Sequence, residues 1–358
     1  MGEGKNLVGV DIGSSSVKVC QLKETRKGYQ LLRLGYAALP PQTIVDGQVM
    51  DAGTVVDTLQ RVFEEAKIRR GAQVGLSVSG QSVIIRKITV PMMTSAELEE
   101  QIHWEAEQHI PFDIKDVQVD YQVLRRRPEA SQMDLLLVAA KRDQIQDYAQ
   151  LARDAKLKPV VCDIDAFTVQ NLFEMSRGLP PDQTFALINI GASLSSLNII
   201  TNGVSAFTRE IANGGNVITE EIQKQMNVPQ EQAETYKCGG GKPVDGETQG
   251  MVPGQVVEVI ESVTDSIAAE IQRSLDFFMA TSGEGEISRI YITGGSANLA
   301  TLASAIERRA RVPVEVWVPT ERIIVEAKEV NREILQERAA QLSVALGLAL
   351  RKDRETRV

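Results

Sequence analysis

Length, composition and charge narrow the class of protein before any motif is considered. The chain has 358 residues, of which 43% are hydrophobic and 24% charged, the balance of a folded globular protein and not of a disordered one. At roughly 100–200 residues per domain, this length predicts about two domains. With 48 acidic and 39 basic residues the net charge is −9, so the composition excludes a broad basic surface for nucleic acid.

Targeting and metal signals are missing from the sequence as well. The longest apolar stretches fall far short of the ~20 residues that a membrane-spanning helix needs, and the N-terminal segment lacks the organisation of a signal peptide. The three cysteines are widely spaced, which suits a reducing compartment, and the two histidines form no legible zinc site. We therefore expect a cytoplasmic protein.

The first 81 residues are predicted to form an α/β unit. Apolar and polar residues alternate on either side of the small-residue turn Gly13-Ser-Ser-Ser16, which predicts a β-hairpin over residues 6–21. A strand over residues 29–39, a helix over 51–68 and a strand over 73–79 follow.

Residues 82–160 are predicted to form a small inserted module of β-α-β-β-α-β order. A strand over 82–90 leads into a helix that begins at the capping box Thr94-Ser-Ala-Glu97 and ends at Ile110-Pro111. Strands over 116–125 and 133–141, a helix over 143–155 and a strand over 158–164 complete the expected module.

The opening pattern returns in the second half of the chain. Asp11-Ile-Gly13 and Asn189-Ile-Gly191 both follow apolar strands and lie 178 residues apart (189 minus 11). Such an internal repeat predicts two domains of one design. The expected elements that follow are a strand over 204–211, helices from Gly214-Gly215 and over 230–237, a flexible loop at 239–241, a helix over 256–280, a strand over 287–293, a helix over 298–310, a strand over 312–318 and a last helix over 335–350.

Four glycine-bearing loops carry the chemical signal. Small side chains, free backbone N–H groups and hydroxyls allow a phosphate to approach the backbone closely. A single Gly-Ser turn is more often structural, because tight turns need glycine. Four such loops in this order, at residues 13–16, 191–195, 214–215 and 292–298, suit a nucleotide held between two domains.

These motifs resemble those of the actin, Hsp70 and sugar-kinase superfamily. Residues 8–18 are similar to its first phosphate motif, 188–193 to its second, and 292–296 to its adenosine motif. Within the superfamily, essentially the whole chain resembles the PilM family of actin-like type IV pilus assembly proteins, which is related to the division protein FtsA. The resemblance is strongest at residues 90–93, 97–98, 104–112, 120–121, 138–141 and 345–351.

The resemblance implies an α/β, actin-like two-domain fold made of duplicated RNase H-like domains with an inserted small α+β subdomain. The first domain would comprise residues 1–81 and 161–204, the latter part overlapping the second phosphate hairpin. The inserted subdomain would span 82–160. The second domain would span 205–358, with a helical subdomain around 216–255.

ATP and Mg²⁺ are the cofactors that the resemblance implies. In the superfamily, two motif carboxylates hold water molecules around the metal; Asp11 matches the first, but Asn189 stands at the second and brings no charge. We therefore expect nucleotide binding with weak or absent hydrolysis. Lys18 has two possible roles: it reaches a phosphate as a point charge, or it is an exposed strand lysine. The residues expected to hold the nucleotide are Gly13, Ser14, Ser15, Ser16, Lys18, Gly191, Ala192, Ser193, Gly214, Gly215, Glu234, Lys237, Gly294, Gly295 and Ser296.

A peptide partner is implied in the same way. In the PilM family the inserted module and the first domain take the N-terminal cytoplasmic peptide of the membrane protein PilN. Trp104, Ile110, Pro111 and Phe112 are the candidate contacts, with packing in a core as the alternative reading. The tail over 351–358 carries mixed charge and no apolar face, so membrane association at the cytoplasmic face of the inner membrane is expected only through partners.

The implied function is a nucleotide-binding scaffold that links the inner-membrane complex to the pilus motor. A motor ATPase, a platform protein and a homo-oligomer or ring stay open as further partners. Two alternatives remain at this point: an active ATPase or small-molecule kinase, and a polymerising division protein of the FtsA kind that would form filaments with ATP.

Overall fold

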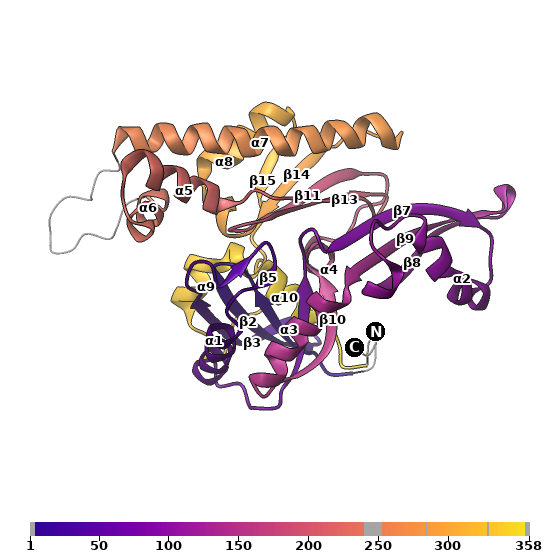
Figure 1. Ribbon diagram of the computed structural model, residues 1–358, viewed down its shortest axis with the longest axis horizontal. Helices are drawn as coiled ribbons and strands as arrows, with labels where there is room; N and C mark the ends of the chain where they lie inside the picture. The colour runs from indigo at the N-terminus through magenta and orange to yellow at the C-terminus, as the bar shows by residue number, and fades with distance from the viewer. Residues whose placement is uncertain (1–3, 240–252, 284, 328, 355–358) are drawn as a thin grey trace.

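Two five-stranded sheets with the same strand order organise the structure, a computed structural model that describes residues 4–239, 253–283, 285–327 and 329–354 (Figure 1). The first sheet has the order β10-β6-β1-β2-β3, and the second has the order β13-β12-β11-β14-β15. In both, an antiparallel run of three strands is extended by two parallel strands. The expected duplication is confirmed. The strands are β1 (Val8–Ile12), β2 (Ser16–Thr25), β3 (Gly28–Ala38), β6 (Gln73–Val78), β10 (Lys158–Ile164), β11 (Thr184–Ile190), β12 (Ser195–Thr201), β13 (Val204–Ile211), β14 (Arg289–Thr293) and β15 (Val314–Val316).

Helices cover the outer face of each sheet. On the first sheet, α1 (Ala52–Glu65) and α3 (Arg142–Asp154) bury their apolar sides against the outward residues of β1 and β2. Asp51 caps α1 by accepting a hydrogen bond of 3.0 Å from Thr54 N. An aspartate directly before a run of apolar residues at helical spacing is a favoured N-cap. On the second sheet the covering helices are α5 (Gly215–Met226), α6 (Gln230–Lys237), α7 (Gly254–Ser282) and α8 (Ala300–Ala310).

Two further helices, α4 (Asp165–Arg177) and α10 (Ser343–Leu350), pack between the inner faces of the two sheets. Their side chains join the inward residues of both sheets in one apolar cluster that includes the fully buried Trp317. The packing is close enough to require glycine. A Cβ on Gly9 of β1 would lie 2.0 Å from the Ala345 carbonyl oxygen, and a Cβ on Gly347 would lie 2.1 Å from that of Thr168.

The inserted module is smaller than the sequence predicted. Its sheet has the order β7-β9-β8, formed by β7 (Val83–Pro91), β9 (Gln132–Lys141) and β8 (Val117–Arg127), and α2 (Ser95–Glu107) packs with it. The capping box of Thr94 and Glu97 at the start of α2 is confirmed. The helix and strand expected at the end of the module are α3 and β10, which instead complete the first domain, because β10 pairs in parallel with β6.

Other differences concern helix ends and a missed helix. The helix α4 and the short hairpin of β4 (Ile44–Val45) and β5 (Gln48–Val49) were not expected from the sequence. The expected last helix is divided into α9 (Arg332–Arg338), a 3₁₀ turn and α10. Of the expected flexible loop at 239–241, residues 240 and 241 lie outside the described residues, as does much of the end of the expected helical subdomain. Among the helices that the structure describes, none has the length and apolar character needed to span a bilayer.

Candidate functional site

The turn at residues 13–16, called here the first phosphate turn after the motif it resembles, has an ion pair at its base between β1 and β2. Asp11 on β1 faces Lys18 on β2 across the antiparallel register, and Lys18 Nζ lies 3.2 Å from Asp11 Oδ2. Both side chains are about nine-tenths buried, with 10% and 12% exposed, so the interpretation of Lys18 as an exposed strand lysine is wrong. A Cβ on Gly13 would lie 3.0 Å from Lys18 Nζ, which puts the ammonium directly beside the turn.

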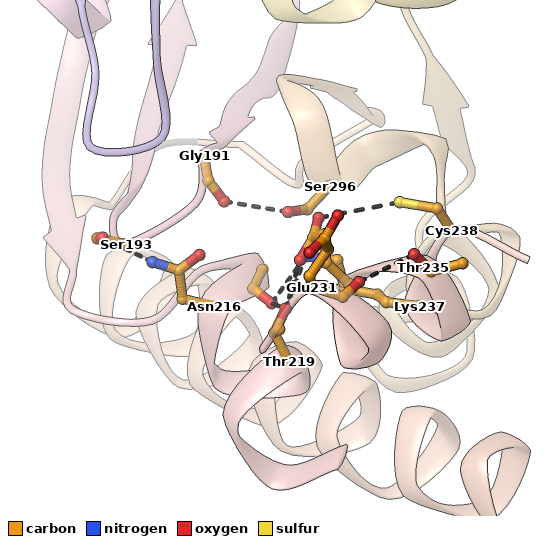
Figure 2. A network of polar contacts seen from close by, with 11 residues as sticks. Gly191, Ser193, Asn216, Thr219, Glu231, Thr235, Lys237, Cys238 and Ser296 are labelled. Carbon is orange, nitrogen blue, oxygen red and sulfur yellow. Dashed lines mark hydrogen bonds and ion pairs between the residues drawn. The ribbon is translucent and has the colours of Figure 1, made fainter. Parts of the chain in front are cut away.

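The second phosphate turn is tied to two other glycine loops. The Gly191 carbonyl oxygen accepts hydrogen bonds of 3.0 Å from Gly215 N and from Ser296 Oγ. The Ala192 carbonyl oxygen accepts one of 2.8 Å from Asn216 N. Figure 2 shows the Gly191 carbonyl group and the Ser296 hydroxyl group pointing toward each other. The loops at 191–193, 214–215 and 294–296, far apart in sequence, therefore meet at one place.

A chain of side-chain hydrogen bonds joins the two phosphate turns. Asn216 Nδ2 donates to Ser193 Oγ at 3.2 Å, and Ser193 Oγ donates to Ser14 Oγ at 2.9 Å. The second bond runs from one domain to the other. The neighbouring serines differ: Ser15 is exposed, whereas Ser16 is fully buried and its Oγ has no hydrogen-bond partner among the residues that the structure describes.

Glu234 and Lys237, the expected adenosine pair, are in contact at the start of α5. Lys237 Nζ lies 2.6 Å from Glu234 Oε2 and donates to Thr219 Oγ1 at 2.9 Å and to the Gly215 carbonyl oxygen at 3.3 Å. Thr219 Oγ1 in turn donates to Glu234 Oε2 at 2.7 Å. Figure 2 shows Thr219 and Lys237 beside the loop that holds Ser296. Thr219, which was not expected from the sequence, lies on α5 and holds the Glu234–Lys237 pair of α6 in place.

The glycines of these loops leave no room for side chains. A Cβ would lie 2.5 Å from the Ala192 carbonyl oxygen at Gly214 and 2.4 Å from Ser296 Oγ at Gly215. Gly294, with φ of +94°, would place a Cβ 2.6 Å from Asn189 Oδ1. The loops therefore present bare backbone and hydroxyls, with the Lys18 ammonium beside the first turn and the Lys237 ammonium beside Gly215. This is the donor set that a phosphate-bearing ligand needs.

Two acids that were not expected from the sequence have raised pKa values, and one of them, Asp165, lies near Asp11. Asp165 is the first residue of α4, and Glu210 is on β13. Burial and the Asp11 carboxylate raise the pKa of Asp165 to about 6, against the opposing effect of hydrogen bonds from Ser77 and Ser79. Burial, together with Asp165, raises the pKa of Glu210 to about 8. Both residues stand at the carboxyl ends of predicted strands, where α/β proteins place their sites, and this position could have identified them in the sequence.

The family model described as type IV pilus assembly protein PilM matches residues 9–353. The chain belongs to the PilM family. A solved PilM-PilN type IV pilus biogenesis complex contains a chain with 29% identity to this one and a TM-score of 0.84, covering 96% of this chain and 98% of that one.

More distant relatives share the fold of this PilM family member. Cell division protein FtsA of Pseudomonas aeruginosa is 23% identical, covering 88% of this chain and 84% of its own length. The structure of MreB5 of Spiroplasma citri bound to AMPPNP has 13% identity and a TM-score of 0.51, covering 98% and 96% of the two chains. The actin-like fold is confirmed. The alternative of a division protein is supported only by the distant similarity to FtsA.

The four candidate partner contacts do not form one exposed surface in this PilM family member. Trp104 on α2 is 63% exposed, whereas Ile110 is buried in the core of the inserted module, as the alternative reading had it. Pro111 is exposed, and Phe112 is half-buried with Lys141 Nζ lying 4.6 Å from its ring centre. Trp104 is the one exposed aromatic side chain of the four, so it is the large apolar group that a partner can reach.

The raised pKa of Glu210 predicts that the protein loses stability as pH rises. Glu210 binds its proton more tightly in the folded chain, so its contribution is complete below pH 4.5 and is lost as pH rises to about 8. Since the pKa rises from 4.5 to about 8 and each pH unit corresponds to about 1.4 kcal/mol, the loss is on the order of 5 kcal/mol. Urea unfolding between pH 5 and 8.5 should show this slope, and Glu210→Gln should flatten it. Glu220→Gln, at an exposed position on α5, should keep it; an unchanged slope in Glu210→Gln contradicts the assignment.

Proposed function

We propose that this chain is a nucleotide-binding scaffold of type IV pilus assembly that binds the N-terminal cytoplasmic peptide of a PilN-type membrane protein. The observation that carries the nucleotide part is the convergence of three glycine loops on the Gly191 carbonyl region, with Ser193 joined to the first turn at Ser14. The peptide part rests on family membership and on the likeness to the PilM-PilN complex. Through its peptide partner, the scaffold would link the inner-membrane complex to the pilus motor.

The residues present fit ATP with Mg²⁺. The backbone of the two phosphate turns, with Ser14 and Ser193, would hold phosphates, and Glu234 and Lys237 would flank the adenosine. Asp11 would hold the metal through water, and Mg²⁺ would supply charge neutralisation of the phosphates. Because Lys18 already pairs with Asp11, the metal has to share that carboxylate with an internal cation. A phosphate lodged between the turns would replace the contact between Ser193 and Ser14, which ties nucleotide binding to domain closure.

Titration with a fluorescent ATP analogue in the presence of Mg²⁺ tests the nucleotide proposal. Saturable binding is expected, and Lys237→Gln should weaken it by about tenfold or more, because Lys237 is mostly buried at the adenosine position. Lys224→Gln is the matched control, since Lys224 is 78% exposed on α5. Absence of saturable binding by the unmodified protein rejects the proposal.

Asn189 is the reason to expect slow ATP hydrolysis. Its amide contributes no charge where the superfamily has a second carboxylate, so metal-bound water would be less strongly activated. Phosphate release by the unmodified protein should be slow, and Asn189→Asp should raise it. Rapid release by the unmodified protein would favour the active ATPase.

Peptide binding provides the test of the scaffold. A synthetic peptide of the first residues of the PilN-type partner should bind, and Trp104→Ala should weaken binding by about tenfold, because a large exposed aromatic is a typical anchor. Val257→Ala removes another exposed apolar side chain, on α7, and should change nothing. If nucleotide controls the partner, the dissociation constant should differ with and without Mg-ATP; equal constants would leave a scaffold without nucleotide control.

A further inference from the structure

Two neighbouring helices of the first domain, α1 and α3, end in the same way. Each is followed by an alanine, a lysine with a left-handed backbone and a buried apolar residue. The φ angle is +54° at Lys67 and +64° at Lys156. The next residues, Ile68 and Leu157, each donate their N–H to a carbonyl oxygen of the preceding helix at 2.9 Å. The two ends lie together, because Gly71 N donates to the Lys156 carbonyl oxygen at 2.8 Å.

Lysine is an unexpected residue at these two positions. The left-handed turn after a helix favours glycine or asparagine, because the Cβ of other residues crowds the backbone there. Asn227 follows this preference at the end of α5. The helix dipole favours a cation anywhere in the last turn, so it does not require a lysine at the strained position. Strain that recurs at two adjacent places indicates that the ammonium groups have a use.

The two helix ends form an exposed basic surface on a chain whose net charge is −9. Residues 67–71 and 153–158 hold six basic residues and one acid, Asp154, which accepts a hydrogen bond from Gln150. All six basic side chains are exposed, and none takes part in an ion pair with a residue that the structure describes. The basic surface consists of Lys67, Arg69, Arg70, Arg153, Lys156 and Lys158.

A hollow of about 390 Å³ opens between the two helix ends. The apolar part of its lining includes Phe63, Ile68 and Leu157, whose side chains are buried in the first domain. Exposed polar side chains complete the lining, and two of them belong to the basic surface. They are Gln60, Glu64, Arg70 and Lys156.

We propose that the basic surface docks an acidic segment of another protein, with one bulky apolar side chain of that segment in the hollow. The carboxylates of the segment would pair with Lys67, Arg70 and Lys156, and the planar guanidinium of Arg70 suits a carboxylate particularly well. A bilayer fits less well, because a plane of lipid phosphates would leave the hollow unfilled and would face Glu64. Complementary charge around an apolar centre is the usual arrangement of a protein interface.

This docking surface is separate from the sites considered so far. It lies on the first domain at the ends of α1 and α3, whereas Trp104 lies on α2 of the inserted module, well apart from them in Figure 1. The nucleotide loops are not part of it either. A scaffold with this surface would hold an acidic partner and a PilN-type peptide at the same time.

Fluorescence anisotropy with a labelled peptide tests the surface. The probe has one phenylalanine between two pairs of glutamates, and the full chain is added at low ionic strength, where exposed charges are least screened. Saturable binding is expected. A peptide with serine in place of the phenylalanine should bind at least about threefold more weakly, because it leaves the hollow empty. A peptide with lysines in place of the glutamates should not bind.

Glycine at the two strained positions separates binding from folding. The double variant Lys67→Gly with Lys156→Gly removes two cations and relieves the left-handed backbone, so its Tm should stay the same or rise. Its affinity for the peptide should fall by about fivefold or more. The matched control is Arg311→Gly with Lys224→Gln, which removes two exposed cations from the second domain, one of them at the left-handed end of α8, and should keep the affinity.

Two results with the peptide overturn the proposal: no saturable binding by the unmodified chain, or equal affinity in the double glycine variant. A third is sedimentation with vesicles of phosphatidylglycerol and phosphatidylethanolamine that the double glycine variant loses while the peptide does not bind, since this would identify a membrane surface instead. ATP binding, measured on the same proteins, should be unchanged by the glycine substitutions. Failure of this surface is therefore distinguishable from failure of the proposed function.

Discussion

Replacing Gly347 with alanine is expected to lower the free energy of unfolding by about 3 kcal/mol or more. The added Cβ would lie 2.1 Å from the Thr168 carbonyl oxygen and 2.5 Å from its carbonyl carbon. These are backbone atoms of α4, in the buried layer between the sheets, and they cannot turn aside as a flexible side chain would. Urea denaturation followed by circular dichroism, and by the fluorescence of the buried Trp317, measures the loss.

Two companion variants make this prediction specific. Gly9→Ala would place a Cβ 2.0 Å from the Ala345 carbonyl oxygen of α10, so a clash arises where β1 packs on that helix. This variant should be similarly destabilising. Gly254→Ala, at the first residue of α7 with no atom within 4 Å of the added Cβ, should be neutral or stabilising by up to about 1 kcal/mol. A Gly347→Ala protein that unfolds at the same urea concentration as the unmodified chain contradicts the packing described here.

Asp11→Ala is expected to destabilise the nucleotide-free protein by about 3 kcal/mol, because it leaves the mostly buried ammonium of Lys18 without its partner. The double variant Asp11→Ala with Lys18→Met removes both charges and should recover most of the lost stability. The difference between the double variant and the sum of the single variants measures the coupling of the pair. Both proteins with Asp11→Ala should lose the dependence of nucleotide binding on Mg²⁺.

An exposed pair on α5 provides the comparison for this cycle. Glu221 lies 3.6 Å from Lys224, whose side chain is 78% exposed, so Glu221→Ala should change stability by less than about 0.5 kcal/mol. An effect of Asp11→Ala no larger than that of Glu221→Ala would show that Lys18 does not depend on Asp11 in the folded chain.

The duplicated design was predictable from the sequence because its signal is local. Each hairpin consists of adjacent strands with a small-residue turn, so Asp11 and Asn189 mark equivalent places that can be recognised within a dozen residues. The capping box at Thr94 and Glu97 is likewise contained in four residues. Each of the four glycine loops can likewise be recognised locally, and it is their combination in this order that predicts a shared site.

The features that the sequence analysis missed depend on contacts between distant segments. The strand over 158–164 has the same local pattern in either domain, and only its pairing with β6 places it in the first sheet. The sequence of α4 is neither fully apolar nor clearly amphipathic, because the helix packs against both sheets. Asp165 and Glu210 show no motif, since what makes them unusual is burial near other acids.

The position of α10 sets the order in which the chain can become stable during synthesis. The inner faces of β1 and β2 pack on a helix that begins at Ser343, more than 300 residues later in the chain. Until the ribosome has released that helix, the first sheet has one open apolar face, although all five of its strands are already made by residue 164. We therefore expect the first domain to complete its folding after the second, with the nascent N-terminal half depending on chaperones in the interval.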